Sequence, residues 1–181
     1  MSKSRIATTS LAGCFGCHMS FLDIDERILD LAELVEFHKS PIDDIKTFTK
    51  RCAIGLVEGG CSNEENVKVL RDFRRHCEIL ISVGVCAISG GVPSMRNTVP
   101  LQECLDEAFL SGPTVYNPEG RTPHDVEIPL LLDKVYPCHE VVKMDYYLPG
   151  CPPSADTLWT VLVALLQDEP VELPYPLIKY D

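Results

Sequence analysis

Four of the nine cysteines lie in short loops rich in glycine or proline, and each loop follows an apolar, strand-like run. Cys14 and Cys17 lie in GCFGC (13–17), Cys86 in GVC (84–86) and Cys151 in PGCPP (149–153). Four thiolates are the usual ligands of an iron–sulfur cluster, and glycine lets backbone N–H groups approach the sulfurs. If the loops converge, these cysteines predict a cluster with a redox role.

The Cys14–Cys17 pair has other interpretations when it is taken alone. A Cys-x-x-Cys pair is also typical of a thioredoxin-like redox site or of half a zinc site. Structural zinc usually draws on two such pairs, whereas this chain has one pair and two single cysteines. Cys151 is followed by proline, as is the last cysteine of many ferredoxin motifs. The whole set favours a cluster, with zinc as the alternative.

Three further residues lie close to these loops in sequence. Cys61, in GGC (59–61), competes for a ligand position but is expected to be a buried or loop thiol. His18 directly follows the pair and is expected beside the site rather than in it. Glu58 ends an apolar run, so it is a candidate proton carrier, backbone-amide acceptor or loop-orienting group. The other cysteines are expected to be apolar filler: Cys52, Cys77, Cys104 and Cys138.

Length and composition predict a single domain over residues 1–181, since the length is near the usual domain size and 45% hydrophobic residues can build a core. The net charge of -11 argues against nucleic acid or an anionic membrane as partner. The longest apolar stretch, residues 158–166, is about half of what a bilayer crossing needs. An odd number of cysteines and no recognisable export signal predict reduced thiols and a cytoplasmic protein.

Five apolar runs predict strands: residues 5–11, 34–37, 52–58, 78–85 and 143–148. Residues 5–11 show no regular alternation of apolar and polar side chains, which indicates a central strand that is buried on both sides. Residues 89–136 are less regular, and a helix is expected there only at 101–110. The tail, residues 168–181, is expected to run extended over a surface.

Capping signals predict the helices between these strands. Ser20 with Asp23 could open a helix with an apolar stripe through Ile24, Ile28 and Leu31. Residues 62 and 65, Ser and Glu, form a capping box before the next helix, and Ser154 caps a last helix to about residue 166. Alternating strands and helices predict an α/β fold with a doubly wound parallel sheet, whose ligands bind outside the carboxyl ends of the strands. All four candidate cysteines fall there.

Nucleotide-binding motifs are missing from the sequence. Neither a GxGxxG fingerprint nor a Walker loop occurs, so direct binding of NAD or ATP has no support. A flavodoxin-like sheet holds flavin at these same loop tips, which makes FMN possible, but no motif supports it.

The motifs together resemble the small subunit of [NiFe] hydrogenases, especially the soluble, NAD(P)-linked bidirectional type. The resemblance rests on CFGC (14–17), VEG (57–59), GVC (84–86) and LPGCPP (148–153), in order over nearly the whole chain. It implies a flavodoxin-like fold in which Cys14, Cys17, Cys86 and Cys151 hold one proximal [4Fe-4S] cluster. It also implies two partners: a large subunit with the nickel–iron centre, and a diaphorase module with flavin and further clusters that passes electrons to NAD. The chain alone is then not catalytic.

Departures from that family narrow the expected number of clusters and the expected location. Membrane-bound and periplasmic relatives have a twin-arginine leader and a carboxyl-terminal extension with two more clusters, and this sequence shows neither, so one cluster in the cytoplasm is expected. Those relatives have Glu before the first ligand, where this chain has Gly13. The cluster-carrying subunit of respiratory complex I has two adjacent cysteines in place of Cys-x-x-Cys. A complex I-like connecting subunit and a zinc-stabilised interaction module are the alternatives.

Overall fold

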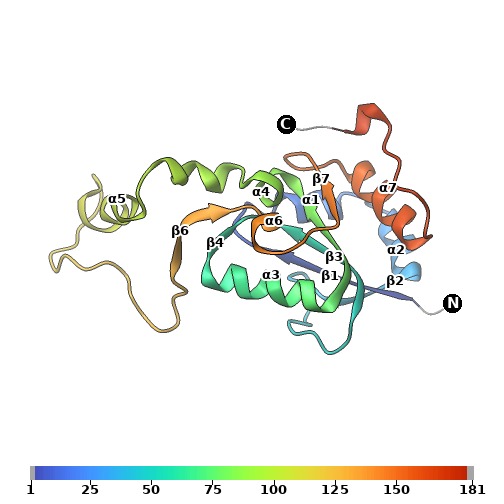
Figure 1. Ribbon diagram of the computed structural model, residues 1–181, viewed down its shortest axis with the longest axis horizontal. Coiled ribbons are helices and arrows are strands. Elements are labelled where there is room, and N and C mark those ends of the chain that lie inside the picture. Colours follow the sequence, from blue (N-terminus) through green and yellow to red (C-terminus); the bar gives the residue numbers. More distant parts are fainter. Residues whose placement is uncertain (1–2, 179–181) are drawn as a thin grey trace.

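The computed structural model describes residues 3–178, within which five parallel strands form one sheet (Figure 1). The strand order is β2-β1-β3-β5-β7, the flavodoxin-like order. The strands are β1 (Ser4–Ser10), β2 (Val35–Lys39), β3 (Cys52–Glu58), β5 (Cys77–Val83) and β7 (Tyr146–Leu148). The predicted α/β fold with a doubly wound parallel sheet is confirmed.

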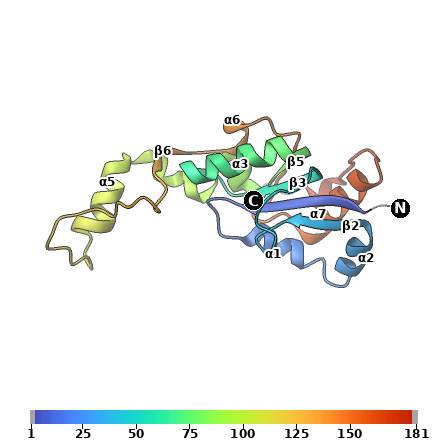
Figure 2. The same cartoon turned by 90° about the horizontal axis from the view of Figure 1, so that it is seen from below.

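Helices cover both faces of this sheet (Figure 2). On one face lie α1 (Gly16–Leu22), α2 (Arg27–Leu34) and α7 (Ala155–Leu166), where Phe21 and Leu158 pack against Ile54. On the other lie α3 (Glu64–His76), α4 (Gly84–Ser89) and α6 (Cys138–Val141), where Phe73 packs with Leu80. Both cores exclude water from the middle strands, which fixes the carboxyl edge of the sheet as a rigid platform.

The segments that carry Cys17 and Cys86 differ from the sequence prediction. The first helix begins at Gly16 rather than near Ser20, so Cys17 and His18 lie in its first turn. Ser20 does not cap it, because its hydroxyl donates to the carbonyl of Pro153 at 2.5 Å. A turn over residues 23–26 then divides the predicted apolar stripe between α1 and α2. Similarly, Cys86 lies in α4 and not in a loop.

The caps of the two longest helices give one correction and one confirmation. Asn63, not Ser62, caps α3, since its side chain accepts a 2.8 Å hydrogen bond from the N–H of Asn66. Ser154 caps α7 as predicted, accepting from Thr157 N–H at 3.2 Å. Each cap satisfies a backbone donor that the first helical turn leaves free.

A second, antiparallel pair of strands was not predicted: β4 (Cys61–Asn63) with β6 (Leu131–Tyr136). Between α4 and β6 lies a 3₁₀ segment, η1 (Val92–Thr98), which was not predicted. After it, α5 (Leu101–Asp106) and a π-helical continuation (Glu107–Ser111) confirm the helix predicted at 101–110. We call residues 99–130 the arm, because they project beyond the sheet (Figures 1 and 2).

The carboxyl-terminal segment after α7 holds one short 3₁₀ turn, η3 (Tyr175–Leu177), and no strand up to residue 178. Residues 179–181 of the predicted tail lie outside the described part. Across residues 3–178, no helix combines the length and the apolar character needed to cross a bilayer.

Candidate iron–sulfur site

The four cysteines singled out by the sequence line one cavity of about 50 Å³ at the carboxyl edge of the sheet. Cys14 precedes α1, Cys17 lies in its first turn, Cys86 lies in α4 and Cys151 follows β7. We call this space the thiol cavity. The structure thus brings together segments far apart in sequence, as expected for loops at the carboxyl ends of parallel strands.

Two glycines make room for the sulfurs in this cavity. A Cβ on Gly84, whose φ is +81°, would lie 2.4 Å from Cys17 Sγ. A Cβ on Gly91, with φ +49°, would lie 2.8 Å from Cys86 Sγ. Both positions combine a left-handed backbone with close approach to sulfur, which only glycine permits.

Backbone groups also approach the thiols. The N–H of Gly16 donates to Cys14 Sγ at 3.4 Å. The N–H of Val85 donates to the carbonyl of Gly150 at 3.0 Å, which joins the α4 segment to the loop that carries Cys151. Amide donors to sulfur tune the reduction potential of a cluster, so the Gly16 N–H bond to Cys14 Sγ fits a cluster in this cavity.

The electrostatics of the thiol cavity favour a bound cation. Burial raises the pKa of Cys17, and the nearby Glu58 carboxylate raises it further. Burial is also the main cause that raises the pKa of Cys86. A bare thiolate is therefore disfavoured at both positions, and iron would supply the compensating positive charge.

The thiols line a cavity wall and do not meet at a point. Among the residues that the structure describes, no three His, Cys, Asp or Glu side chains come close enough together to hold one metal ion. Four thiols around a space suit a multi-iron cluster better than a single zinc, which needs its ligands converging at about 2.3 Å.

The remaining cysteines lie outside the thiol cavity wall. Cys61 is fully buried in β4, and burial raises its pKa to about 11. Cys52, Cys77 and Cys138 are core residues, as predicted, while Cys104 is half-buried on α5.

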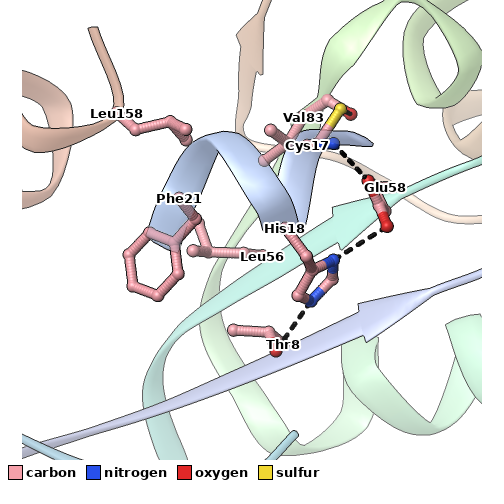
Figure 3. A pocket seen from close by; sticks show the side chains of 8 residues that line it. All are labelled: Thr8, Cys17, His18, Phe21, Leu56, Glu58, Val83 and Leu158. Carbon is pink, nitrogen blue, oxygen red and sulfur yellow. Dashed lines mark hydrogen bonds and ion pairs between the residues drawn. The ribbon is translucent and has the colours of Figure 1, made fainter. Parts of the chain in front are cut away.

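His18 and Glu58 form a buried pair behind the thiol cavity (Figure 3). The Glu58 carboxylate accepts from His18 Nδ1 at 2.8 Å and from the Cys17 backbone N–H at 2.9 Å. Glu58 is therefore a backbone-amide acceptor, one of the roles considered from sequence. Burial alone would raise its pKa, but the hydrogen bonds that the carboxylate accepts, with that of His18 the strongest, outweigh burial and hold the pKa below its ordinary value.

Two residues of this assembly, Thr8 and Ser40, were not predicted from the sequence. Thr8 Oγ1 lies 3.0 Å from His18 Nε2 and 2.7 Å from Ser40 Oγ. The signal for Thr8 in the sequence was a run of three hydroxyl residues, 8–10, directly after Ile6 and Ala7.

Comparisons with known proteins show the family to which the chain belongs. Residues 14–165 match the family described as NADH ubiquinone oxidoreductase, 20 Kd subunit. The chain is 51% identical to the delta subunit of the NAD-reducing hydrogenase HoxS of Cupriavidus necator, covering 99% of this chain and 86% of that protein. It is 37% identical to a subunit of the F420-non-reducing hydrogenase of Methanothermobacter marburgensis, covering 95% of this chain but only 56% of that protein.

Solved structures show the same relationship. A chain of the NAD+-reducing [NiFe]-hydrogenase in the H2-reduced state superposes with a TM-score of 0.96 and 53% identity, covering 99% of this chain and 100% of that one. A chain of the [NiFeSe]-hydrogenase of Dm. baculatum, at 15% identity and a TM-score of 0.58, shares the fold. The chain therefore belongs to the family of the NADH ubiquinone oxidoreductase 20 Kd subunit and, within it, to the small subunits of NAD-reducing [NiFe] hydrogenases.

Proposed function

We propose that this chain is the electron-transfer small subunit of a cytoplasmic NAD(P)-linked [NiFe] hydrogenase, and that Cys14, Cys17, Cys86 and Cys151 hold one [4Fe-4S] cluster. The observation that carries the proposal is the convergence of these four thiols on one cavity. The likeness to the NAD-reducing hydrogenase subunit supports it. A cluster held there would supply one-electron transfer.

The chain's own residues bind, shield and position that group. Gly84 and Gly91 leave space for the sulfurs of Cys17 and Cys86. Glu58 holds the backbone of Cys17 from behind. Cys14 and Cys151 are the exposed pair of the four, so their side of the cavity is the one that partner subunits would cover.

The proposed partners follow from the same reasoning. A large subunit with the nickel–iron centre would deliver electrons to this chain, and a diaphorase module with flavin and clusters would pass them to NAD. Reduction of NAD requires the intracellular nicotinamide pool, which supports a cytoplasmic location. We assign neither flavin nor catalysis to this chain by itself.

Iron and acid-labile sulfide analysis with electron paramagnetic resonance, on protein purified without oxygen, tests the cluster. We expect about four iron and four sulfide per chain and a signal after dithionite reduction. Cys86→Ala should lose iron and sulfide together with NAD-coupled hydrogen oxidation, whereas Cys104→Ala, with its thiol on α5, should keep all three. Zinc without sulfide in the wild-type protein would contradict the proposal and favour the interaction module.

The alternative of a quinone-linked, complex I-like subunit has less support. The family match by itself includes that class. The Cys14–Cys17 pair and the identity to a hydrogenase subunit favour the hydrogenase. Co-purification with a nickel-containing partner separates the two, because a quinone-linked complex has no nickel–iron centre.

A further inference from the structure

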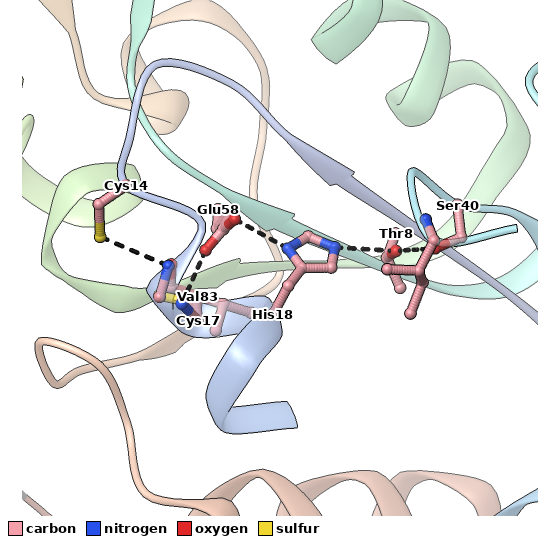
Figure 4. A network of polar contacts seen from close by, with 9 residues as sticks. Thr8, Cys14, Cys17, His18, Ser40, Glu58 and Val83 are labelled. Carbon is pink, nitrogen blue, oxygen red and sulfur yellow. Dashed lines mark hydrogen bonds and ion pairs between the residues drawn. The ribbon is translucent and has the colours of Figure 1, made fainter. Parts of the chain in front are cut away.

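A continuous chain of hydrogen bonds starts at the thiol cavity and runs into β1 and β2 (Figure 4). The Cys17 N–H donates to Glu58 Oε2 at 2.9 Å, and His18 Nδ1 lies 2.8 Å from Glu58 Oε1. His18 Nε2 lies 3.0 Å from Thr8 Oγ1, which lies 2.7 Å from Ser40 Oγ. Four side chains thus connect the Cys17 backbone to the end of β2.

All four side chains belong to buried residues. Glu58, His18, Thr8 and Ser40 are 3%, 5%, 1% and 2% exposed. The small void beside them measures about 10 Å³, at the lower limit for one water molecule. Apolar side chains contribute most of its other walls, namely Phe21, Leu56, Val83 and Leu158 (Figure 3). The contacts are therefore direct, and they lie in a region of low dielectric constant.

The directions of these hydrogen bonds are mutually consistent. A carboxylate can only accept, so His18 Nδ1 donates to Glu58. With a neutral ring, His18 Nε2 accepts from the Thr8 hydroxyl, and Thr8 in turn accepts from Ser40. Ser40 Oγ also accepts from the Ile42 N–H at 3.3 Å, so this hydroxyl has both a donor and an acceptor partner. Every member has a partner, which makes the chain rigid.

The imidazole is also held by the segment that carries the first two thiols. The rings of Phe15 and His18 stack at 4.5 Å with an interplanar angle of 7°. Phe15 lies between Cys14 and Cys17 and has a left-handed backbone, φ 67°. His18 is therefore fixed by stacking on one side and by hydrogen bonds at both ring nitrogens.

We propose that Thr8 and Ser40 are positioning residues for the cluster, which act through His18 to hold the Glu58 carboxylate as a fixed negative charge at the wall of the thiol cavity. This rests on the proposed function. Glu58 lines both the thiol cavity and the small void, so the charge borders the cluster space directly. A nearby negative charge disfavours the arrival of an electron, most strongly where water is excluded, and so lowers the reduction potential.

The test is a redox titration of the cluster in the hydrogenase complex, followed by electron paramagnetic resonance. Glu58→Gln removes the charge with little change of shape, so the midpoint potential should rise. Thr8→Val removes the hydroxyl but keeps the shape, so the potential and the line shape should shift. Thr8→Ser restores the hydroxyl and should return both to the wild-type values.

Two further variants separate positioning from packing. Ser40→Ala, at the far end of the chain, should shift the potential in the same direction as Thr8→Val, but less. Thr9→Val changes a neighbouring residue that is also buried but takes no part in the chain of hydrogen bonds. It should leave the potential unchanged.

Iron and sulfide content distinguishes failure of this inference from failure of the proposed function. If the wild-type complex holds no cluster, the proposed function fails. If Glu58→Gln keeps full iron but its potential stays the same or falls, the inference fails. It fails equally if Thr8→Val keeps full iron with an unchanged potential and line shape. If Thr8→Val loses its iron, Ser40→Ala takes its place in the test. The inference then fails if Ser40→Ala keeps full iron with an unchanged potential and line shape.

Discussion

Glu58 Oε2 accepts a 2.9 Å hydrogen bond from the backbone N–H of Cys17, a residue 41 positions earlier in the chain. The bond joins the end of β3 to the first turn of α1, so the central strand positions the second thiol of the pair. A thiol on a rigid element keeps its place better than one on a free loop. The Cys14–Cys17 segment is therefore fixed to the sheet at its second cysteine.

Gly84→Ala should prevent assembly of the cluster. The new Cβ would lie 2.4 Å from Cys17 Sγ, and alanine would also be strained at φ +81°. We expect the iron content to fall to a small fraction of the wild-type value. Iron analysis of protein purified without oxygen measures this.

Gly120→Ala is the matched control for that variant. Gly120 also has a positive φ, +62°, but its Cβ would have no neighbour within 4 Å. It carries backbone strain without a clash, at a cost of about 1 kcal/mol. Equal loss of iron in both variants would show that strain alone, and not contact with sulfur, explains the effect.

Asp145→Asn should destabilise the fold. The Asp145 carboxylate accepts from Arg74 at 2.6 Å and from the Leu80 N–H at 2.9 Å, which ties the segment before β7 to β5. Losing the charge should cost about 1.5–3 kcal/mol of unfolding free energy, measured by urea denaturation. In contrast, Glu119→Gln breaks an exposed pair with Arg121 and should cost less than about 1 kcal/mol.

The same carboxylate predicts a pH dependence. Burial opposes ionisation of Asp145, but the hydrogen bond and charge of Arg74 outweigh it and lower its pKa from the ordinary value. A group whose pKa is lower in the folded state stabilises the fold above its unfolded pKa, and that stability is lost as the pH falls through the folded pKa. The stability difference between wild type and Asp145→Asn should therefore shrink below about pH 4. A difference that persists undiminished at pH 2 would contradict the assignment.

Asn63→Ala should weaken α3. The Asn63 side chain caps this helix by accepting from the Asn66 N–H, and removing such a cap costs about 1 kcal/mol. Ser62→Ala should cost less, since Ser62 precedes the cap. Thermal unfolding of the two variants, followed by circular dichroism, compares them; a larger loss for Ser62→Ala would mean that the sequence-based capping box is correct.

Alkylation should separate buried from accessible thiols. Cys61 is fully buried with a pKa raised to about 11, so it should resist iodoacetamide at pH 8 until the protein unfolds. Half-buried Cys104 should react in the folded protein. A bound cluster should protect Cys14 and Cys151, which are otherwise exposed. Mass spectrometry before and after removal of iron measures each site, and rapid labelling of Cys61 in folded protein would contradict its placement.

The parallel sheet was largely predictable from sequence because its central strands, β3 and β5, are mostly apolar. The third predicted strand, residues 52–58, has the bounds of β3. The fourth was predicted to reach residue 85, but β5 ends at Val83 because Gly84 turns the chain with a positive φ. Hydropathy reports burial, and it does not report where the backbone changes conformation.

The local structure of the thiol segments was not predictable in this way. The signal at Ser20 and Asp23 suggested a helix start, yet the left-handed Phe15 begins α1 earlier and the Ser20 hydroxyl bonds to Pro153. The β4–β6 pair was missed because β4 has three residues, and its partner lies about seventy positions later. Such pairing depends on tertiary contacts that a local pattern does not contain.

The arm is closed at its base by residues that flank it. Asn97 exchanges two hydrogen bonds with the backbone of Val135, at 2.9 and 2.8 Å, and Arg96 donates to the carbonyl of Leu132 at 2.8 Å. η1 and β6 therefore stay together whatever the length of the chain between them. Residues 99–130 could therefore be lengthened, shortened or exchanged as a unit, while the part of the fold that carries Cys86 and Cys151 keeps its shape.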